Sequence, residues 1–585
     1  MELNHNYANS LVSKLLFAAI KKSYPEVEYS ESQIYESLSA PPNLKMGQVA
    51  FPCFPLAKEC KMAPPMIAKT IQENLENDAS VEETKLAGPY LNFVLKKEAL
   101  AKNIIGEISS GNFFTKELTK DTPKTMVEYS QPNTHKILHV GHMRNLCLGS
   151  ALVNILRYSG QETISTTYPG DMGTHVAKCL WYLKYKNPDP VPVENRGAWL
   201  GQMYATANQL LEDEIGTPNE ESNRKQLTEI IKQIENQNGE FYELWKETRE
   251  WSIALMKQAY SWANVDFDRW FFESEVDEDS LKLMKDLQAK GILVEDQGAV
   301  GMRLDEYNLG FCILIKSDGT GMYSTKDVEL ARKKFEEFGI QKSIYVVDNR
   351  QAFHFNQVFK VLEIIGFEQA KDCFHLQYDV VELPDGAMSS RKGNIVPLMD
   401  LISNMEHTIT TNYLEKYRGD WSDEEIDKVA RQLAGGAIKY GMIRVDNNRK
   451  IVFNMEEWLK LDGETGPYLQ YVYARINSLC HKFNYDSSAQ VDFGKLTHDL
   501  EEALLVKLGN FNSIVVNCAK QLKTIHLTSY LFELGKLFNS YYAECSIGGA
   551  DDEETKLARL ALAYSVGEVM KKGLAILGIE APARM

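Results

Sequence analysis

Residues 125–142 read TMVEYSQPNTHKILHVGH. The apolar run at the start of this stretch predicts a strand, and the residues after HVGH continue as a helical run to about Ser159. Gly160 ends that run before ETISTTY (162–168), which predicts a second strand. A strand, a helix and a strand form a βαβ unit, in which the strands are parallel and the crossover is right-handed. The sequence therefore predicts an α/β domain built on a parallel sheet.

The pattern of apolar and polar residues divides the rest of the chain into regions of different expected structure. Residues 1–115 combine helical runs with the strand-like GPYLNFVL (88–95), so we expect a small α+β domain there. Residues 190–300 are mostly helical and acidic and resemble an insertion, and from about residue 400 the pattern is almost wholly helical. Sheet signals return in three runs: FCILIKS (311–317), SIYVVD (343–348) and HLQYDVVEL (375–383).

Length and composition limit the classes of function. A chain of 585 residues exceeds a single core, and 44% apolar with 25% charged residues is typical of globular proteins. The net charge of −17 has the wrong sign for a protein that coats DNA or RNA non-specifically.

No run approaches the ~18 apolar residues of a spanning helix, and no basic segment precedes LLFAAI near the N-terminus, so neither membrane insertion nor secretion is expected. The 9 cysteines include no CxxC pair, which favours reduced, mostly buried thiols in the cytoplasm.

HVGH lies directly after a predicted strand and opens a helix. The carboxyl ends of parallel strands border the crevice in which α/β sheets bind ligands, and a helix N-terminus offers unpaired N–H groups to a phosphate. His139 and His142 are three residues apart and can face one ligand, and Gly141 lets a flat base approach the backbone. Two alternatives remain. One is an H-x-x-H metal site, for which the neighbourhood supplies no third ligand. The other is a helix N-terminus with two hydrogen-bonded histidines.

MSSRKGN (388–394) follows a predicted strand. Two hydroxyls, two cations and a glycine on a loop suit a mobile clamp on a triphosphate. The alternative is an exposed basic turn, which is the commoner role of such a sequence.

MYSTKD (322–327) carries Tyr323 and Asp327 four residues apart, on one face of a predicted helix. A carboxylate there could accept a guanidinium or an ammonium group. The alternative is a surface N-cap, because Ser324, Thr325 and Asp327 are all common at helix starts.

The helix that begins at Pro467 has two faces. One is an apolar stripe of core residues: Leu469, Val472, Ile476, Leu479 and Phe483. The other carries Tyr468, Tyr471, Arg475 and Lys482, and such aromatic and basic groups can stack on unpaired bases. A solvated amphipathic face is the alternative.

HVGH after a strand and MSSRK in a later loop together resemble the two signatures of class I aminoacyl-tRNA synthetases, HIGH and KMSKS. The resemblance narrows to the arginyl-tRNA synthetase family and covers essentially the whole chain. It is carried by EYSQPNTHKILHVGHMRN (128–145), YPGDMGTHVAK (168–178), IYVVDNRQAFHF (344–355), LGIEAPARM (577–585), GPYLQYVYARI (466–476), KMGQVAFPCFPLAK (45–58) and GPYLNFVL (88–95).

The resemblance implies a Rossmann-type catalytic domain between a small α+β domain and an all-α anticodon-binding domain. The expected parts are an N-terminal tRNA-contacting domain (1–115), a catalytic domain (116–400) with its helical insertion (190–300), a helical connector (401–460) and the anticodon-binding domain (461–585).

By position, the resemblance assigns three sets of site residues. Arginine is expected at Glu128, Gln131, Pro132, Asn133, His142, Tyr323, Asp327 and Gln351, with Tyr323 and Asp327 at the guanidinium and Asn133 and Gln351 near the α-amino and carboxylate end. ATP is expected at His139, Gly141, His142, Met388, Ser389, Ser390, Arg391 and Lys392, and the catalytic groups are Lys136, His139, His142, Arg391 and Lys392. Tyr468, Tyr471 and Arg475 are expected to bind tRNA.

Two positions depart from the family pattern. Gln131 stands where the family usually has Ser. Ala387 stands in place of the first KMSKS lysine and Arg391 in place of the second, with Lys392 one position later. A lysine just ahead of HIGH is thought to compensate in this family, and Lys136 occupies that position.

The implied activity is arginine–tRNA ligation in two steps. Arginine's carboxylate attacks the α-phosphate of ATP, and the arginyl group then passes from arginyl-adenylate to the terminal ribose of tRNA(Arg). Catalysis by positioning and charge stabilisation is expected, without a nucleophile or general base. The expected partners are tRNA(Arg), L-arginine and ATP with Mg²⁺. No structural metal, DNA or membrane is expected, and the protein is expected to be a cytoplasmic monomer.

Two rival functions were weighed. A non-catalytic RNA-binding relative would be expected to have lost its ATP signatures, and HVGH and MSSRKG are both present. A stand-alone nucleotidyltransferase of the same superfamily would leave the long helical region after the second signature unexplained.

Overall fold

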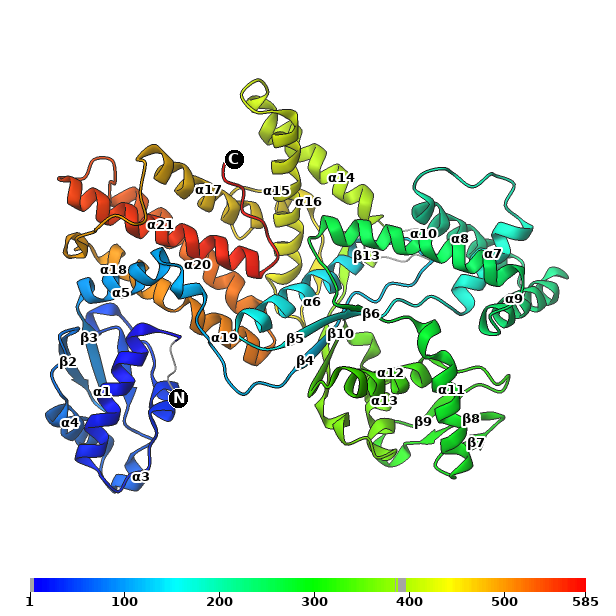
Figure 1. The fold of residues 1–585 in the computed structure, drawn as a ribbon, viewed down its shortest axis with the longest axis horizontal. Coiled ribbons are helices and arrows are strands. Elements are labelled where there is room, and N and C mark those ends of the chain that lie inside the picture. Colours follow the sequence, from blue (N-terminus) through cyan, green and yellow to red (C-terminus); the bar gives the residue numbers. More distant parts are fainter. Residues whose placement is uncertain (1–4, 385, 388–395) are drawn as a thin grey trace.

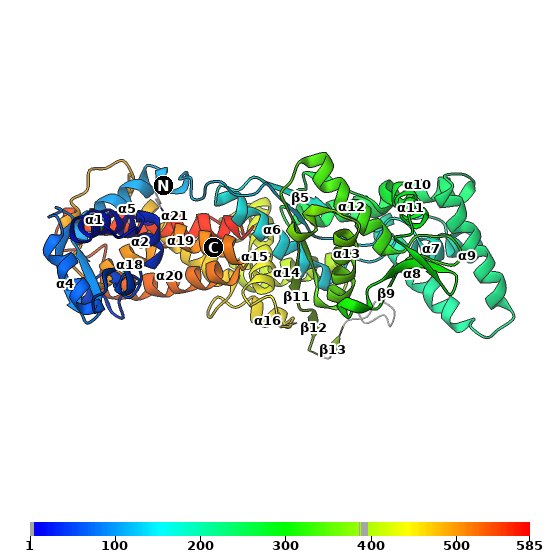
Figure 2. The ribbon, with the colours of Figure 1, turned by 90° about the horizontal axis from the view of Figure 1, so that it is seen from below.

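The computed structural model describes residues 5–384, 386–387 and 396–585. Figure 1 shows the central sheet in the middle of the molecule, the N-terminal part and the C-terminal helices on one side of it, and the insertion helices on the other. Seen from below, the molecule is elongated, with these two sides at opposite ends (Figure 2).

The predicted parallel sheet is confirmed. It has five strands in the order β11-β10-β4-β5-β6, and every neighbouring pair is parallel. Its strands are β4 (Thr125–Glu128), β5 (Thr163–Thr167), β6 (Arg269–Trp270), β10 (Lys342–Asp348) and β11 (Cys373–Tyr378). Helix α6 (Val140–Tyr158) connects β4 to β5, as the βαβ pattern predicts. Glu128, the last residue of β4, is paired in register with Thr166 and Tyr345, so its side chain lies near the carboxyl edge of the sheet.

The N-terminal part is α+β, as expected. It contains an antiparallel sheet of order β1-β3-β2. The elements are α1 (Tyr7–Ser23), α2 (Glu31–Ser37), β1 (Val49–Pro52), α3 (Ala57–Cys60), α4 (Pro64–Asn74), β2 (Val81–Ala87), β3 (Tyr90–Leu95) and α5 (Lys97–Ser109). This part packs against the C-terminal helices: Gln48 donates to Glu502 at 2.7 Å, and Asn512 donates to the carbonyl of Phe113 at 3.0 Å.

The insertion is helical only in part. Its helices within the predicted bounds of 190–300 are α8 (Arg196–Asp213), α9 (Asn219–Glu235), α10 (Glu240–Trp262) and α11 (Glu273–Ala289), and α7 (Thr174–Tyr185) precedes them. These bounds also enclose β6 of the central sheet, between α10 and α11. The helices are followed by an antiparallel sheet made of β7 (Val294–Asp296), β8 (Ala299–Arg303) and β9 (Phe311–Ile315). The run FCILIKS therefore forms β9 of a separate sheet, which α12 (Tyr323–Phe338) connects to the central one. Helix α13 (Ala352–Ile364) connects β10 to β11 within the central sheet.

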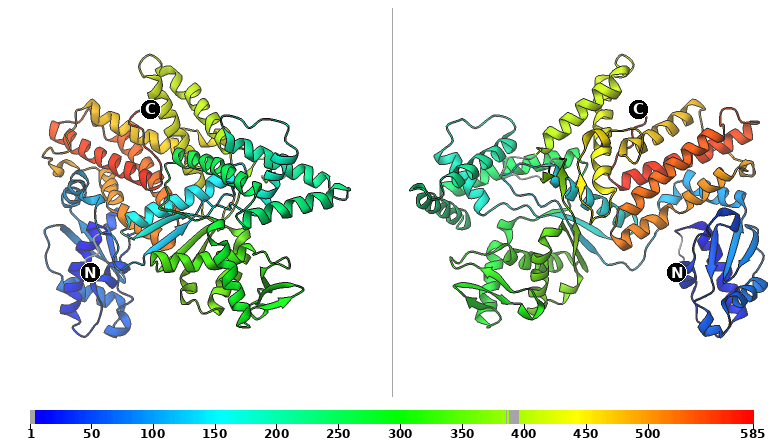
Figure 3. Two further views of the ribbon diagram at one scale, coloured as in Figure 1. Left: turned by 45° about the vertical axis from the view of Figure 1, so that its right-hand side comes forward. Right: turned by 180° about the vertical axis from the view of Figure 1, so that it is seen from behind.

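The chain after residue 396 is helical apart from one short strand, in agreement with its patterning. Its helices are α14 (Leu398–Ile409), α15 (Asp423–Ile443), α16 (Met455–Trp458), α17 (Gly466–Lys482), α18 (Asp499–Gly509), α19 (Phe511–Gln521), α20 (Ile525–Glu544) and α21 (Glu553–Ile576). The short strand β14 (Ile451–Val452) pairs with β12 (Val381–Leu383), which in turn pairs with β13 (Gly386–Ala387). Figure 3 shows the orange and red helices of this part beside the N-terminal part, while the yellow-green ones rise above the sheet.

Seven of the nine cysteines are buried. Burial raises the pKa of Cys147 and Cys53 to about 12, so these two thiols stay protonated near pH 7. Within the described part of the chain, no helix is both long and apolar enough to cross a membrane. The domain boundaries at 115, 400 and 460 stay predictions.

Candidate active site

The HVGH turn caps α6 with its own two histidines. Gly141 donates its N–H to Nδ1 of His139, and His139 donates its N–H to Nδ1 of His142, both at 3.1 Å. Since each Nδ1 accepts a hydrogen bond, the ring proton of each neutral imidazole lies on Nε2. Burial, with a contribution from Arg350, lowers the pKa of His139 to about 4. Burial and the neighbouring His139 hold the pKa of His142 well below its usual value. Both rings are therefore neutral N–H donors near pH 7.

This geometry bears on the two alternatives for HVGH. The Nδ1 atoms are engaged in the cap, as in the interpretation of a helix N-terminus with two hydrogen-bonded histidines, and no hydrogen bond of either Nε2–H is seen among the described residues. The metal interpretation lacks ligands, since no group of three His, Cys, Asp or Glu within the described ranges could hold an ion.

The described residues that follow the second signature lie directly beside the first signature. Leu398 donates to the carbonyl of Leu138 at 2.8 Å, and Val140 donates to the carbonyl of Val396 at 3.3 Å. The predicted ATP residues Met388, Ser389, Ser390, Arg391 and Lys392 lie outside the described residues. The chain that follows them, from Val396 on, is hydrogen-bonded to the HVGH turn.

The loop between β4 and α6 carries several predicted residues in a strained backbone. Ser130 and His135 have φ of 55° and 59°, in the left-handed region that few non-glycine residues adopt. The loop lies against Gly170, where an added Cβ would come within 2.4 Å of Asn133 Oδ1, so a larger residue there would displace the Asn133 amide. Thr134 donates its N–H to the carbonyl of Gly170 at 2.9 Å, which fixes Asn133 beside the YPGD segment.

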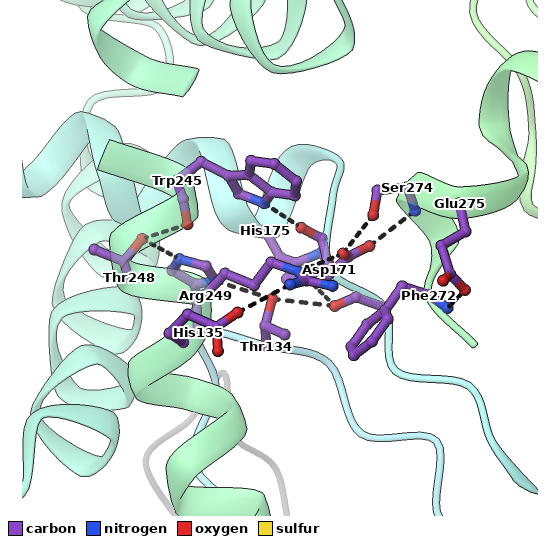
Figure 4. Close-up of polar contacts among 12 residues, drawn as sticks. Thr134, His135, Asp171, His175, Trp245, Thr248, Arg249, Phe272, Ser274 and Glu275 are labelled. Carbon is purple, nitrogen blue, oxygen red and sulfur yellow. Dashed lines mark hydrogen bonds and ion pairs between the residues drawn. The ribbon is translucent and has the colours of Figure 1, made fainter. Parts of the chain in front are cut away.

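Asp171 joins this loop to the insertion, as Figure 4 shows. The carboxylate is fully buried and accepts from Arg249 Nε at 2.7 Å, from Ser274 N at 3.0 Å and from Ser274 Oγ at 2.7 Å. Arg249 lies on α10, with its Cζ 4.0 Å from the ring centroid of Phe272. The ion pair therefore fixes the N-terminus of α11 and the helix α10 to the YPGD segment.

A second contact fastens α10 to the β4–α6 loop. His135 is fully buried, and its ring nitrogens lie 2.9 Å from Thr134 Oγ1 and 2.8 Å from Thr248 Oγ1 (Figure 4). Burial lowers the pKa of His135 to about 3, so the ring is neutral. The insertion thus supports the loop that carries the predicted arginine residues.

Tyr323 and Asp327 lie at the start of α12, and their neighbours exclude the N-cap alternative. Ser324 Oγ donates to the carbonyl of Ile313 at 2.8 Å, and Thr325 Oγ1 donates to that of Leu314. No side chain caps the helix. Tyr323 is 57% exposed, whereas the Asp327 side chain is 21% exposed and contacts His354 Nε2 at 2.5 Å.

Glu273 is a buried carboxylate that the sequence did not single out. It opens α11, is 6% exposed, and its Oε2 has no hydrogen-bond partner. Burial raises its pKa to about 8; Lys326, 3.7 Å away, opposes the rise, and Asp171, Asp327 and Asp277 add to it. Acidic residues are ordinary in a first helical turn, so the local pattern does not separate Glu273 from Glu275. Only the fold brings it close to Asp327.

The remaining predicted arginine residues are placed as follows. Glu128 is buried, with one oxygen paired to Lys334 Nζ of α12 and the other accepting from Gln131 Nε2 at 3.3 Å. Pro132 is buried, and Gln351 is exposed just before α13. Lys136 is partly buried, with Nζ 5.2 Å from the ring centroid of Tyr204 on α8.

The predicted tRNA face of α17 is divided by packing. Leu469, Val472, Ile476 and Leu479 are buried, as expected of the core stripe. Tyr468 is also buried, and its hydroxyl accepts from Asn539 at 2.9 Å, so it does not share the more exposed side of Tyr471, which is 39% exposed. This differs from the expected two-faced helix, because α20 covers the side on which Tyr468 lies.

Arg475 borders a surface pocket of about 440 Å³. Its Cζ lies 4.2 Å from the ring centroid of Tyr542. Lys482 and Phe483 also line the pocket, which therefore combines aromatic faces with two cations.

Comparisons with known proteins give one consistent match. Residues 106–455 match the model for the catalytic domain of class I (R) tRNA synthetases, residues 469–585 the DALR anticodon binding domain, and residues 10–95 the arginyl tRNA synthetase N terminal domain. The chain is 54% identical to an arginine–tRNA ligase of Bdellovibrio bacteriovorus over 583 residues, covering 100% of both, and 34% identical to one of Clostridium perfringens, covering 98% and 99%. The solved arginyl-tRNA synthetase of Thermus thermophilus is similar with a TM-score of 0.80 at 26% identity, over 99% of this chain and 100% of that one.

Proposed function

The chain belongs to the arginyl-tRNA synthetase family of class I, and from that premise we propose how its own side chains perform arginine–tRNA ligation. The enzyme activates arginine with ATP and transfers the arginyl group to tRNA for protein synthesis. A stand-alone nucleotidyltransferase is excluded, because the C-terminal helices match an anticodon-binding domain.

We propose that arginine's guanidinium binds between Asp327 and Glu273, beside Tyr323. The observation that carries this proposal is the buried Glu273, whose Oε2 meets Lys326 Nζ at 3.7 Å but accepts no hydrogen bond from the described residues, and which lies close enough to Asp327 for their charges to interact. A buried carboxylate oxygen without a hydrogen bond is costly, and a guanidinium donates five N–H groups that can satisfy two carboxylates. Asn133 and Gln351 are proposed for the α-amino and carboxylate end, as the family resemblance implies.

Glu128 is also proposed to contact arginine, but its carboxylate already has partners in the protein. Its two oxygens already meet Lys334 and Gln131, so a contact with the substrate would be shared with that pair. Gln131 also accepts from Asn145 Nδ2 at 3.2 Å, which holds the amide in place.

We propose that ATP binds at the N-terminus of α6. The Nε2–H groups of His139 and His142 are neutral donors suited to phosphate oxygens, and the helix end adds N–H groups and a positive dipole. Lys136 and the 388–392 loop would supply the cations. Mg²⁺ would arrive on the ATP phosphates, which offer the oxygen ligands it prefers.

Two surfaces are proposed for tRNA. The pocket of Arg475 and Tyr542 combines stacking faces with positive charge, as a base-binding site requires. In the N-terminal part, Phe54 and Tyr90 form an exposed edge-to-face pair, 53% and 37% accessible, which could receive an unpaired base. The monomeric state and the cytoplasmic location stay predictions.

The proposal is tested by charging total tRNA with each amino acid and then by Asp327→Asn. Arginine alone is expected to be charged. Removing one charge of a desolvated pair costs ~2–5 kcal/mol, so the substitution should raise the KM for arginine on the order of 10²-fold or more. Glu336→Gln, an exposed carboxylate on the same helix, is the matched control. An unchanged KM in Asp327→Asn would remove Asp327 from the site.

A further inference from the structure

Asp327 is held by a histidine from the next helix. His354 Nε2 lies 2.5 Å from Asp327 Oδ2, and the two side chains are 26% and 21% exposed. His354 lies on α13 and Asp327 on α12, so the contact depends on how the two helices pack. The ring of His354 also meets that of Phe355 edge-on, with centroids 5.5 Å apart.

This contact fixes the orientation of the carboxylate. One bond to Oδ2 uses a single lone pair, so Oδ1 and the second lone pair of Oδ2 can still accept. A planar guanidinium fork needs both oxygens in a defined orientation, and a carboxylate held at one oxygen loses little further freedom when the substrate binds. His354 is therefore placed to prepare Asp327 for a bidentate partner.

The contact also makes the pKa of His354 depend on the charge of Asp327. Burial lowers the pKa of His354, but the hydrogen bond and charge of Asp327 raise it more, so that the net direction is upward. Among the described residues, His375 of β11 interacts electrostatically with this ring, and Glu273 of α11 interacts with Asp327. When a guanidinium reaches Asp327, two cations share one carboxylate, which opposes the imidazolium.

We propose that His354 is a positioning residue for the amino acid: its imidazole orients the Asp327 carboxylate and releases its proton to solvent when arginine binds. This inference rests on the proposed role of Asp327 as the guanidinium ligand. It adds a residue that does not touch the substrate but sets its affinity and makes that affinity depend on pH.

The sign of the pH dependence follows from linkage. The proton is bound more tightly in the free enzyme than in the arginine complex, so arginine affinity is reduced below the free-enzyme pKa of His354 and rises as pH increases through it. That pKa lies above 6.5. Glu273 must lose its own proton to meet a guanidinium and so changes affinity in the same direction, but around pH 8. The two contributions have to be separated by substitution.

The experiment measures arginine binding to the full-length enzyme by calorimetry between pH 6 and 8.5, in buffers of different ionisation enthalpy that count released protons. The variants are His354→Gln, His354→Ala, Glu273→Gln and Asp327→Asn. His526→Gln, a histidine on α20 bonded to Gln521, is the matched control and should bind arginine as the wild type does.

His354→Ala should bind arginine on the order of 10-fold more weakly than wild type at the upper end of this pH range, because a hydrogen bond to a charged group is lost. The difference should shrink as pH falls, because the wild type then carries the imidazolium that opposes arginine and the variant does not. His354→Gln can still donate an amide N–H but has no titrating proton. It should recover much of that loss, release fewer protons, and lose the pH dependence near neutrality. Glu273→Gln should keep the proton release that belongs to His354.

Three outcomes would contradict either the role of His354 or the proposed role of Asp327. If His354→Gln keeps the wild-type pH profile and proton count, His354 is not the group that releases the proton. If His354→Ala binds arginine as tightly as wild type at an unchanged melting temperature, its positioning role is wrong. If Asp327→Asn binds arginine normally, the proposed function of that site fails first, and this inference fails with it. Should His354→Ala not fold, His354→Gln still decides the question.

Discussion

Arg144 donates from Nη2 to the carbonyl oxygen of Asn447 at 3.1 Å, although 303 residues separate them in the chain. Its Nη1 donates to the carbonyls of Asp379 and Val380, just before β12. The guanidinium is 1% exposed and lies on α6, the helix that His139 caps. One side chain therefore joins the HVGH helix, the chain that leads toward the second signature, and the segment between α15 and β14.

The first prediction is that Arg144→Lys lowers both stability and turnover. A lysine cannot reproduce the planar fork that meets three carbonyls, and each unsatisfied buried acceptor costs ~1–3 kcal/mol. Thermal unfolding should show a lower Tm, and kcat for charging should fall more than the affinity for ATP. Arg157→Lys is the matched control: it lies on the same helix, but its pair with Asp268 is 42% and 49% exposed. Equal effects of both substitutions would contradict the specific role of Arg144.

The second prediction concerns Asp171. Asp171→Asn removes the charge that the partly buried Arg249 meets in Figure 4, and breaking a buried pair in this way costs ~3–5 kcal/mol. Because Asp171 also caps the helix that begins at Glu273, the KM for arginine should rise more than the KM for ATP. Glu250→Gln removes the exposed partner of the same arginine and should change stability by less than ~1 kcal/mol. A KM for arginine that stays at the wild-type value would separate Asp171 from the arginine site.

The sequence predicted the features that depend on local patterning. The strand at Thr125, the helix after His139 and the second strand of the βαβ unit are all present, because periodicity and the glycine at its end are local signals. Features that depend on distant packing were missed. The run at Phe311 pairs with β8 in a separate sheet, and the burial of Tyr468 depends on α20. Glu273 carries no motif at all, and its environment comes from residues distant in the chain such as Lys326, Asp171 and Asp327.

The third prediction concerns the pH dependence of stability. The pKa of Glu273 is about 8 in the folded enzyme, above its unfolded value of 4.5. A raised folded-state pKa means that the folded state binds the extra proton, so this contribution to stability is complete below pH 4.5 and is lost as pH rises through about 8. Glu273→Gln cannot ionise, so its Tm should fall less than that of wild type between pH 6 and 8.5 without arginine.

Glu275→Gln, on the same helical turn but more exposed, is the control and should keep the wild-type pH profile. If Glu273→Gln and wild type lose stability in parallel across this range, Glu273 does not hold the extra proton.

The fourth prediction concerns the cation that replaces the missing KMSKS lysine. Lys136→Ala should lower kcat for charging by roughly 10²-fold, with a much smaller change in the KM for ATP, as expected when a preorganised donor acts in the transition state. Lys186→Ala removes a lysine that lies over Trp181 in the insertion and should leave kcat unchanged. Near-normal turnover in Lys136→Ala would assign the role to the 388–392 loop alone.

The fifth prediction concerns tRNA. Combining Tyr471→Ala with Arg475→Ala removes an exposed aromatic ring and a cation next to the pocket that Tyr542 lines. Each base stacked on such a side chain contributes ~1–3 kcal/mol, so tRNA affinity should fall at least 10-fold and depend less on salt. Filter retention measures tRNA binding, and calorimetry measures ATP binding. Since Arg475 stacks on Tyr542 without an ion pair among the described contacts, its loss should leave the Tm within a few degrees of wild type.

The matched control removes the same two residue types from the β8–β9 region: Arg303→Ala with Tyr307→Ala, where Tyr307 is 45% exposed. That variant should bind tRNA as the wild type does. Lost tRNA affinity at an unchanged Tm and an unchanged ATP affinity, seen only in the α17 variant, would assign this pocket to tRNA. A parallel drop in Tm would instead mean that the substitutions unfold the helical domain. If the α17 variant binds tRNA as tightly as wild type, α17 does not contact a base and is only core and solvated surface. A base stacked on Tyr471 and Arg475 would bind measurably more weakly once both side chains are removed.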